Sequence, residues 1–258
     1  MRRVLVGLAL SGMLGAPRMA VAQNNTEIQV YGADLVAPGA TMVELHSNFT
    51  FRGRADTVDG VLPTRHAFHE TLEITHGFTS IFEVGFYVFT NERAGDGAAV
   101  TGVHIRPRFR LPASWNLPVG LSLSQEFGYA RREFSADTWT WEIRPIIDQT
   151  IGPVYWSFNP VLEVALHGES AGQAPGFSPN AKIAVQVVPW MQMGVEYYGA
   201  LGPITGLDPL QAQEQQIFPA LDFNFSPNLE INTGVGFGLT NATDKLLAKL
   251  ILGYRFGA

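Results

Sequence analysis

The chain has 258 residues, of which 17 are basic, 23 are acidic and none is cysteine, and its formal net charge is −6. The absence of cysteine excludes disulfides and thiolate metal sites, and the acidic balance argues against nucleic acid as a partner. Charged residues make up only 16% of the chain, below the roughly 25% of soluble domains. No later stretch reaches about 18 consecutive apolar residues, which excludes helical membrane spans.

The N-terminus has the pattern of a secretory signal. Arg2 and Arg3 supply a positive start, Val4 to Leu14 form a short apolar run, and Ala20-Val21-Ala22 offers a cleavage site of small residues. The apolar run is shorter than the about 20 residues of a transmembrane helix, which disfavours an uncleaved anchor. We predict a signal peptide over residues 1–22, cleaved after Ala22. Its loss leaves 14 of the 17 basic residues against 23 acidic ones, a net charge of −9.

The remaining sequence alternates apolar and polar residues, the pattern of strands with two different faces. Each of about twelve such segments approaches the about 9–11 residues of a tilted transmembrane strand. Short connections alternate with longer ones, as in outer-membrane barrels, and a soluble β-sandwich fits this rhythm less well. We predict an all-β fold, a transmembrane antiparallel up-and-down β-barrel of about 12 strands over residues 42–256, with an even strand number and both termini periplasmic. The predicted strands are 42–52, 66–76, 81–90, 99–111, 119–130, 138–148, 153–166, 178–188, 191–199, 214–225, 229–239 and 245–256.

Two features flank this strand pattern. Residues 23–41 are predicted to form an N-terminal periplasmic segment, either a tail or a segment folded against the barrel base. Proline falls on the lipid-facing parity inside strands at Pro107, Pro145, Pro160 and Pro219. Because proline has no N–H to donate, bulges or strand ends are predicted there.

The last strand ends on Tyr254 and Phe256 and is predicted to pair with the first strand near Val43 to Phe51. Large aromatic residues on the lipid-facing parity gather near strand ends, where the bilayer meets water. We predict two interfacial aromatic girdles that include Trp139, Trp141, Trp156, Phe158, Phe223, Phe225, Tyr254 and Phe256.

The opposite parity carries most of the charge and is predicted to line the lumen. Two interpretations stay open: a constriction whose transverse field orients solutes, or acid–base pairs that fill a narrow barrel. Folding each hairpin about its turn places Glu83 near Arg106, Arg106 near Ser124, Ser124 near Arg144, and Arg144 near Ser157. At the next inward-facing position along these strands, the same folding places four residues side by side: His104, Glu126, Glu142 and Asn159. The predicted lumen belt consists of Arg106, Arg108, Arg110, Arg144, Glu83, Glu126, Glu142, Glu163 and His104.

The remaining clusters of polar residues in the sequence do not indicate a catalytic site. His46 is expected to meet Glu73 across the first hairpin as an ion pair rather than as part of a ligand set. The run His167-Gly168-Glu169-Ser170 contains the residue types of a lipase pair, but it lies in a predicted external loop without an orienting strand. We predict no catalytic residue, no metal site and no cofactor.

Four segments of the chain resemble a known group. Glu27–Gly32, Met42–Phe49, Glu70–Thr79 and the last hairpin, Gly234–Phe256, are similar to outer-membrane proteins of the phenol meta-cleavage (MetA) degradation pathway, which are described as transporters. The resemblance implies a β-barrel associated with passage of hydrophobic or aromatic compounds. Its motifs are structural, and it assigns no functional residue here.

These observations predict a channel for passive passage of small solutes through the cell outer membrane. A non-conducting structural or adhesion barrel with a salt-bridge-filled lumen is the alternative, and a lipid-modifying enzyme the weakest one. Expected partners are outer-membrane lipid, lipopolysaccharide, an unidentified solute, and the barrel-assembly machinery, which would meet the C-terminal strand. The chain ends Phe256-Gly257-Ala258 rather than on a terminal Phe.

Overall fold

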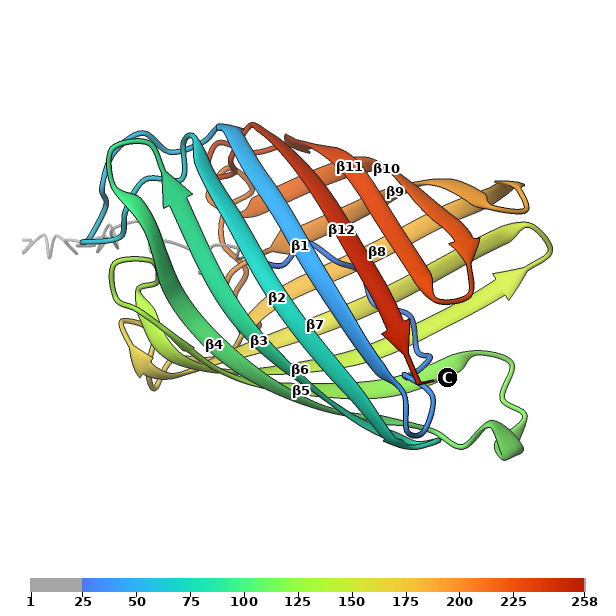
Figure 1. Cartoon of the computed structure of the whole chain (residues 1–258). Coiled ribbons are helices and arrows are strands. Elements are labelled where there is room, and N and C mark those ends of the chain that lie inside the picture. The colour runs from blue at the N-terminus through green and yellow to red at the C-terminus, as the bar shows by residue number, and fades with distance from the viewer. Residues whose placement is uncertain (1–24, 258) are drawn as a thin grey trace, which may run out of the picture.

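The computed structural model describes residues 25–257 and forms a closed barrel of twelve antiparallel strands (Figure 1). Strand β1 closes the barrel against β12, with Val43 opposite Tyr254 and Phe49 opposite Ala248. The predicted antiparallel barrel of twelve strands and its closing pair are confirmed, and the strand bounds agree to within about three residues. The predicted signal peptide lies outside the described residues. The strands are β1 (Thr41–Arg52), β2 (Ala67–Thr79), β3 (Phe82–Arg93), β4 (Gly97–Arg110), β5 (Gly120–Ala130), β6 (Asp137–Ile151), β7 (Val154–Gly168), β8 (Gly176–Val188), β9 (Met191–Ala200), β10 (Glu214–Ser226), β11 (Leu229–Gly238) and β12 (Leu246–Phe256).

The barrel wall is polar inside and apolar outside. On β1 the side chains of His46, Asn48 and Thr50 are buried, whereas Leu45 and Phe51 are 36% and 46% exposed. Because successive side chains of a strand point to opposite faces, the buried parity faces the barrel interior. The arrangement is the reverse of a soluble core and matches a barrel surrounded by lipid. Among residues 25–257, no helix has the length and apolar character of a membrane span.

The connections differ between the two ends of the barrel. One end carries the loops 53–66, 131–136, 169–175, 201–213 and 239–245, and we call it the long-loop end. The other, the short-turn end, has tight turns at 80–81, 152–153, 189–190 and 227–228, and a longer connection at 111–119 with a 3-10 helix, η1 (Ala113–Trp115). The connection between β3 and β4, residues 94–96, is short although it lies at the long-loop end.

The prolines interrupt the ladder without ending the strands. Beside Pro145 on β6 and Pro160 on β7 the β6–β7 ladder lacks pairs, yet its register is the same on both sides of the gap. The β4–β5 ladder beside Pro107 and the β10–β11 ladder beside Pro219 behave alike. The predicted bulges and strand ends are therefore wrong at these sites. Each proline omits a hydrogen bond, and the neighbouring pairs hold the strand in place.

Residues 25–40, which we call the interior segment, run through the barrel from end to end. Asn25 donates a hydrogen bond to Asp244 in the loop 239–245 at 2.7 Å. Gly39, at the other end of the segment, donates to the carbonyl of Gly77 near the short turn 80–81 at 2.8 Å. Figure 1 shows the segment as the blue chain within the barrel. The sequence predicts a periplasmic tail or a segment at the barrel base; the structure places it in the lumen instead.

Candidate functional site

Buried charges of the interior form a network on β2, β3 and β4. The Arg106 guanidinium lies 2.5 Å from Glu73 Oε1 and 3.6 Å from Glu83 Oε1, and Arg108 lies 3.6 Å from the same Glu83 oxygen. The side chains of these four residues are at most 4% exposed. Buried charges of opposite sign must be paired to offset the loss of hydration. Two arginines and two glutamates achieve that here.

The strand register brings some predicted neighbours together and shifts others. Ser124 lies opposite Arg144, as predicted. Glu83 and Ser124, however, both lie opposite Arg108 rather than Arg106. Glu83 still reaches Arg106 because a long arginine side chain spans a diagonal position of the sheet. The prediction that Arg144 lies near Ser157 is wrong, because Ser157 lies opposite Asp148.

The predicted row of acids is present but is composed differently. Glu126 lies opposite Glu142, as predicted, and Glu142 lies opposite Glu163 rather than Asn159. His104 lies opposite Gly128 and reaches Glu126 diagonally, through a contact between its Nδ1 and the Glu126 carboxylate. The row would be strongly repulsive without cations. Arg144 supplies one, because its Nε lies 2.6 Å from Glu142.

The remaining predicted residues lie toward the ends of the barrel. Arg110 forms an ion pair of 2.9 Å with Asp34 of the interior segment at the short-turn end. Of the aromatic residues, Trp139 and Trp141 lie near the long-loop end, beside Tyr129 and Phe127. The residues near the short-turn end are Trp156, Phe158, Phe223, Phe225, Tyr254 and Phe256.

Tyr31 of the interior segment occupies the centre of the charged network. The guanidinium carbons of Arg106, Arg144 and Arg108 lie 4.8, 5.0 and 5.7 Å from the centre of its ring. These distances are those of cation–π contacts, which are stronger in a desolvated interior. The Tyr31 hydroxyl also donates to the carboxylate of Glu27, four residues earlier in the chain. The belt arginines therefore bind an aromatic ring and are adjacent to a carboxylate.

Side chains of the wall also satisfy the backbone of the interior segment. Asn159 accepts from the Tyr31 N–H at 2.9 Å and donates to its carbonyl at 3.0 Å. Ser157 donates to the same carbonyl at 2.6 Å, and Asp148 accepts from the Ala33 N–H at 2.9 Å. Among the described residues, backbone groups of a strand bind the backbone of the interior segment only at its end, where Gly77 of β2 pairs with Gly39 and Ala40. The sequence does not predict these contacts; the alternation of apolar Ile28 and Val30 is a local signal of a strand-like, partly buried segment.

The opposite side of the interior segment is apolar. Ile28 and Val30 form a buried cluster with side chains from β9, β10 and β12. The wall residues of this cluster are Tyr198, Phe218 and Leu247, each with no exposed surface. Lys249 lies beside the cluster and donates to the Ile28 carbonyl at 3.1 Å.

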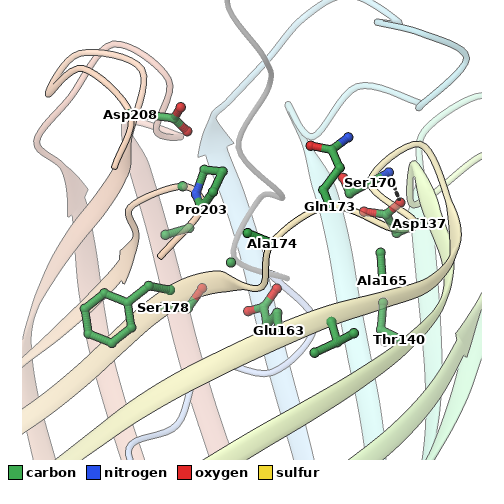
Figure 2. A pocket seen from close by; sticks show the side chains of 15 residues that line it. Asp137, Thr140, Glu163, Ala165, Ser170, Gln173, Ala174, Ser178, Pro203 and Asp208 are labelled. Carbon is green, nitrogen blue, oxygen red and sulfur yellow. Dashed lines mark hydrogen bonds between the residues drawn. The ribbon is translucent and has the colours of Figure 1, made fainter. Parts of the chain in front are cut away.

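Cavities lie on either side of this filled middle. Near the long-loop end a space of about 60 Å³ is lined by Asp137, Glu163 and Asp208, among others, which Figure 2 shows around it. Near the short-turn end a more polar space of about 440 Å³ is lined by Asp34, Arg110 and other residues. The interior segment lies between them. The barrel thus has a cavity near each end and a packed middle.

The residues with possible catalytic chemistry remain apart. His167 Nδ1 lies 2.7 Å from the Thr138 hydroxyl, and the Ser170 N–H donates to Asp137. Among the described residues, no contact joins His167 to Ser170. His46 Nε2 lies 3.4 Å from Glu73 Oε2, which confirms that the two meet across the first hairpin.

The fold is shared with known outer-membrane proteins. No family model matches the chain, and no curated protein sequence matches it. Among solved structures, the COG4313 outer membrane channel from Pseudomonas putida F1 is 12% identical, with a TM-score of 0.62 over 89% of this chain and 100% of that chain. The KdgM porin is 10% identical, with a TM-score of 0.55 over 84% of this chain and 99% of that chain. At such low identity the similarity establishes the fold, that of an outer-membrane β-barrel.

Proposed function

We propose that the protein is a channel of the Gram-negative outer membrane and that its interior segment closes the lumen. The observation that carries the proposal is the path of residues 25–40 between two cavities of the barrel. The wall holds this segment mainly through side chains, whereas the strand ladder closes on itself without it. The segment can therefore leave the lumen while the hydrogen bonds of the barrel stay intact.

The solutes that we propose are small, with aromatic compounds among them. The central constriction already holds the ring of Tyr31 against three guanidinium groups. A solute ring that enters after the interior segment has moved would find the same stacking surface. The resemblance to proteins of the phenol meta-cleavage pathway supports this choice and does not identify one compound. The belt residues would orient the solute through their field.

A variant that lacks residues 25–36 tests the proposal. The deletion keeps the predicted signal peptide and begins the barrel at the same strand. In planar bilayers we expect a higher conductance from this variant than from the full chain, because the central obstruction is gone. Heat-modifiable migration on gels verifies that both proteins are folded barrels. Equal conductance of the two folded proteins would contradict the proposal.

A non-conducting structural or adhesion barrel is the second candidate. The buried acid–base network and the filled lumen favour it. In that case the deletion variant would remain silent in bilayers although it folds. We propose no enzymatic role. A lipid-modifying enzyme would instead hydrolyse phospholipid or lipopolysaccharide, and His167→Ala would abolish the hydrolysis.

The outer aromatic and apolar surface supports contact with outer-membrane lipid and lipopolysaccharide. We also propose that the barrel-assembly machinery recognises the C-terminal strand during insertion into the membrane. Its last aromatic residues, Tyr254 and Phe256, are 46% and 52% exposed. The negative charge of the chain gives no reason to expect nucleic acid as a partner.

A further inference from the structure

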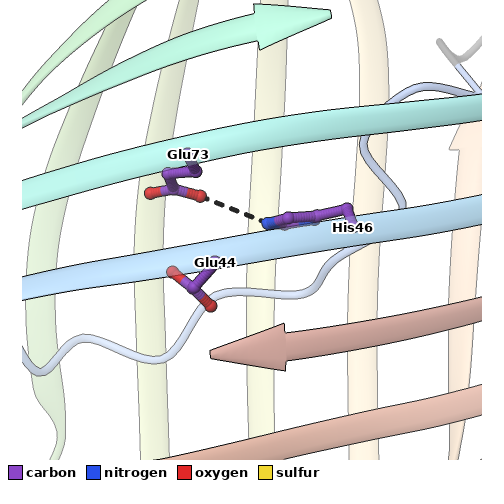
Figure 3. A group of neighbouring side chains, drawn as sticks. All are labelled: Glu44, His46 and Glu73. Carbon is purple, nitrogen blue, oxygen red and sulfur yellow. Dashed lines mark ion pairs between the residues drawn. The ribbon is translucent and has the colours of Figure 1, made fainter. Parts of the chain in front are cut away.

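Three side chains with metal-binding atoms converge inside the barrel, beside the interior segment. Glu44 and His46 come from β1 and Glu73 from β2, and Figure 3 shows them facing one another. Glu44 lies directly opposite Glu73 in the ladder, and His46 is the next inward-facing residue of β1. One donor atom from each residue lies within 4.8 Å of the other two. Glu44 is 6% exposed, and His46 and Glu73 are completely buried.

The hydrogen bonds of this cluster are incomplete. Glu73 Oε1 accepts from Arg106 at 2.5 Å and from Thr75 at 2.7 Å, but Glu73 Oε2 has no hydrogen-bond partner among residues 25–257. Within the described part of the chain, both ring nitrogens of His46 also lack hydrogen-bond partners. Buried polar atoms are rarely left unsatisfied, because the loss of their hydration is not recovered. Atoms of this kind, aimed at each other, indicate a missing binding partner.

The spacing of these atoms fits a metal ion. His46 Nε2 lies 3.4 Å from Glu73 Oε2, which is longer than the about 2.7–3.2 Å of a good N–H···O hydrogen bond. Zinc binds imidazole nitrogen and carboxylate oxygen at about 2.0–2.2 Å, and in a tetrahedral site two such ligands are then about 3.3–3.5 Å apart. We propose that Glu44, His46 and Glu73 bind a divalent transition-metal ion with the ligand preferences of Zn²⁺.

The surrounding charge favours a cation. Glu44 is a buried carboxylate that no ion pair neutralises in residues 25–257, whereas Arg106 compensates Glu73. The cluster contains two carboxyl groups, and the arginine beside it is paired with Glu73. Gln29 of the interior segment interacts with Glu44 through its side chain, and its Oε1 is buried without a partner. This oxygen is available next to the cluster as a further ligand.

A third carboxyl group, that of Glu230, lies near the cluster on β11. Gly253 on β12 lies opposite both Glu44 on β1 and Glu230 on β11. A side chain at Gly253 would meet the methyl group of Met42 first, and then Glu44 Cγ at 3.0 Å and Glu230 Cβ at 3.4 Å, so Met42 occupies the space over the glycine between the two acids. The Glu230 side chain is 43% exposed. Glu230 forms an ion pair of 3.8 Å with Arg255, so the proposed ligand set remains Glu44, His46 and Glu73.

Zn²⁺ titration of the full chain tests the site. The folded protein in detergent is first stripped with a chelator and then titrated by isothermal calorimetry, with bound zinc counted by atomic emission. We expect one ion per chain. Both His46→Gln and Glu44→Gln should weaken the affinity by more than about tenfold, because each removes one ligand.

His69→Gln is the matched control, because His69 is a buried inward-facing histidine of β2 that contacts Asn91 rather than the cluster. Its affinity should equal that of the unmodified chain. Zinc binding that is absent, or equally strong in all four proteins, would overturn the proposal. If His46→Gln does not fold, the nearly isosteric Glu44→Gln decides the question. None of these measurements depends on conduction.

Discussion

The interior segment is held by two unlike surfaces of the same barrel. On the side of β9 to β12, Ile28 and Val30 pack against Phe218 and its neighbours in a dry cluster. On the side of β4 to β7, Tyr31 is surrounded by guanidinium groups, and Asn159 satisfies its backbone. Apolar packing depends on size and shape and tolerates small movements, whereas hydrogen bonds fail as soon as their geometry is lost. The apolar side should therefore contribute most of the free energy that holds the interior segment in the barrel, and the polar side should fix the position of the segment.

One assay can compare both sides, because the chain has no cysteine of its own. Ala33 of the interior segment has no exposed surface, so Ala33→Cys introduces a single thiol that a maleimide reaches only when the segment moves. When opening is in rapid equilibrium, the labelling rate follows the open population and rises about tenfold per 1.4 kcal/mol of destabilisation. Each substitution below is made in this background.

The largest effect is expected from Phe218→Ala on the apolar side. Removing a fully buried phenyl ring typically costs about 3–5 kcal/mol, because apolar contacts are lost and a cavity remains. Labelling of Ala33→Cys should accelerate by roughly a hundredfold or more. Phe237→Ala is the control, because Phe237 lies on the outer surface and is 45% exposed. Equal labelling in the two variants would show that the apolar cluster does not hold the segment.

Asn159→Ala should have an intermediate effect on the polar side. It leaves the buried N–H of Tyr31 without an acceptor, although Ser157 still donates to the Tyr31 carbonyl. A buried unsatisfied group costs about 1–3 kcal/mol, so labelling should rise roughly tenfold to a hundredfold.

The control for this substitution is Asn180→Ala. Asn180 lies opposite Asn159 on the next strand and is equally enclosed, but it makes no hydrogen bond to the interior segment among the described contacts. Faster labelling in Asn180→Ala than in Asn159→Ala would mean that the labelling rate follows the loss of any buried polar side chain rather than the loss of the Tyr31 contacts.

The sequence predicted the wall far better than it predicted the interior. Strand positions follow from alternation, which is a local property, and all twelve strands were found. Pairings such as Glu83 with Arg108 depend on where each turn is centred. When a turn is displaced by one residue, the cross-strand partner of every residue changes by two positions. The place of residues 25–40 could not be predicted, because their partners come from many distant strands. Tyr31 alone contacts residues that are 126 and 128 positions away.

The smallest effect is expected from Arg110→Ala, at the edge of the polar side. Its ion pair with Asp34 is 2.9 Å long, but the two side chains are 29% and 85% exposed. Solvent and salt screen such a pair, which is worth about 0–1 kcal/mol. Labelling of Ala33→Cys should change less than about fivefold, and high salt should reduce the difference. A change as large as that of Phe218→Ala would instead mean that the end of the segment nearest β1, and not the dry cluster at its middle, controls its release.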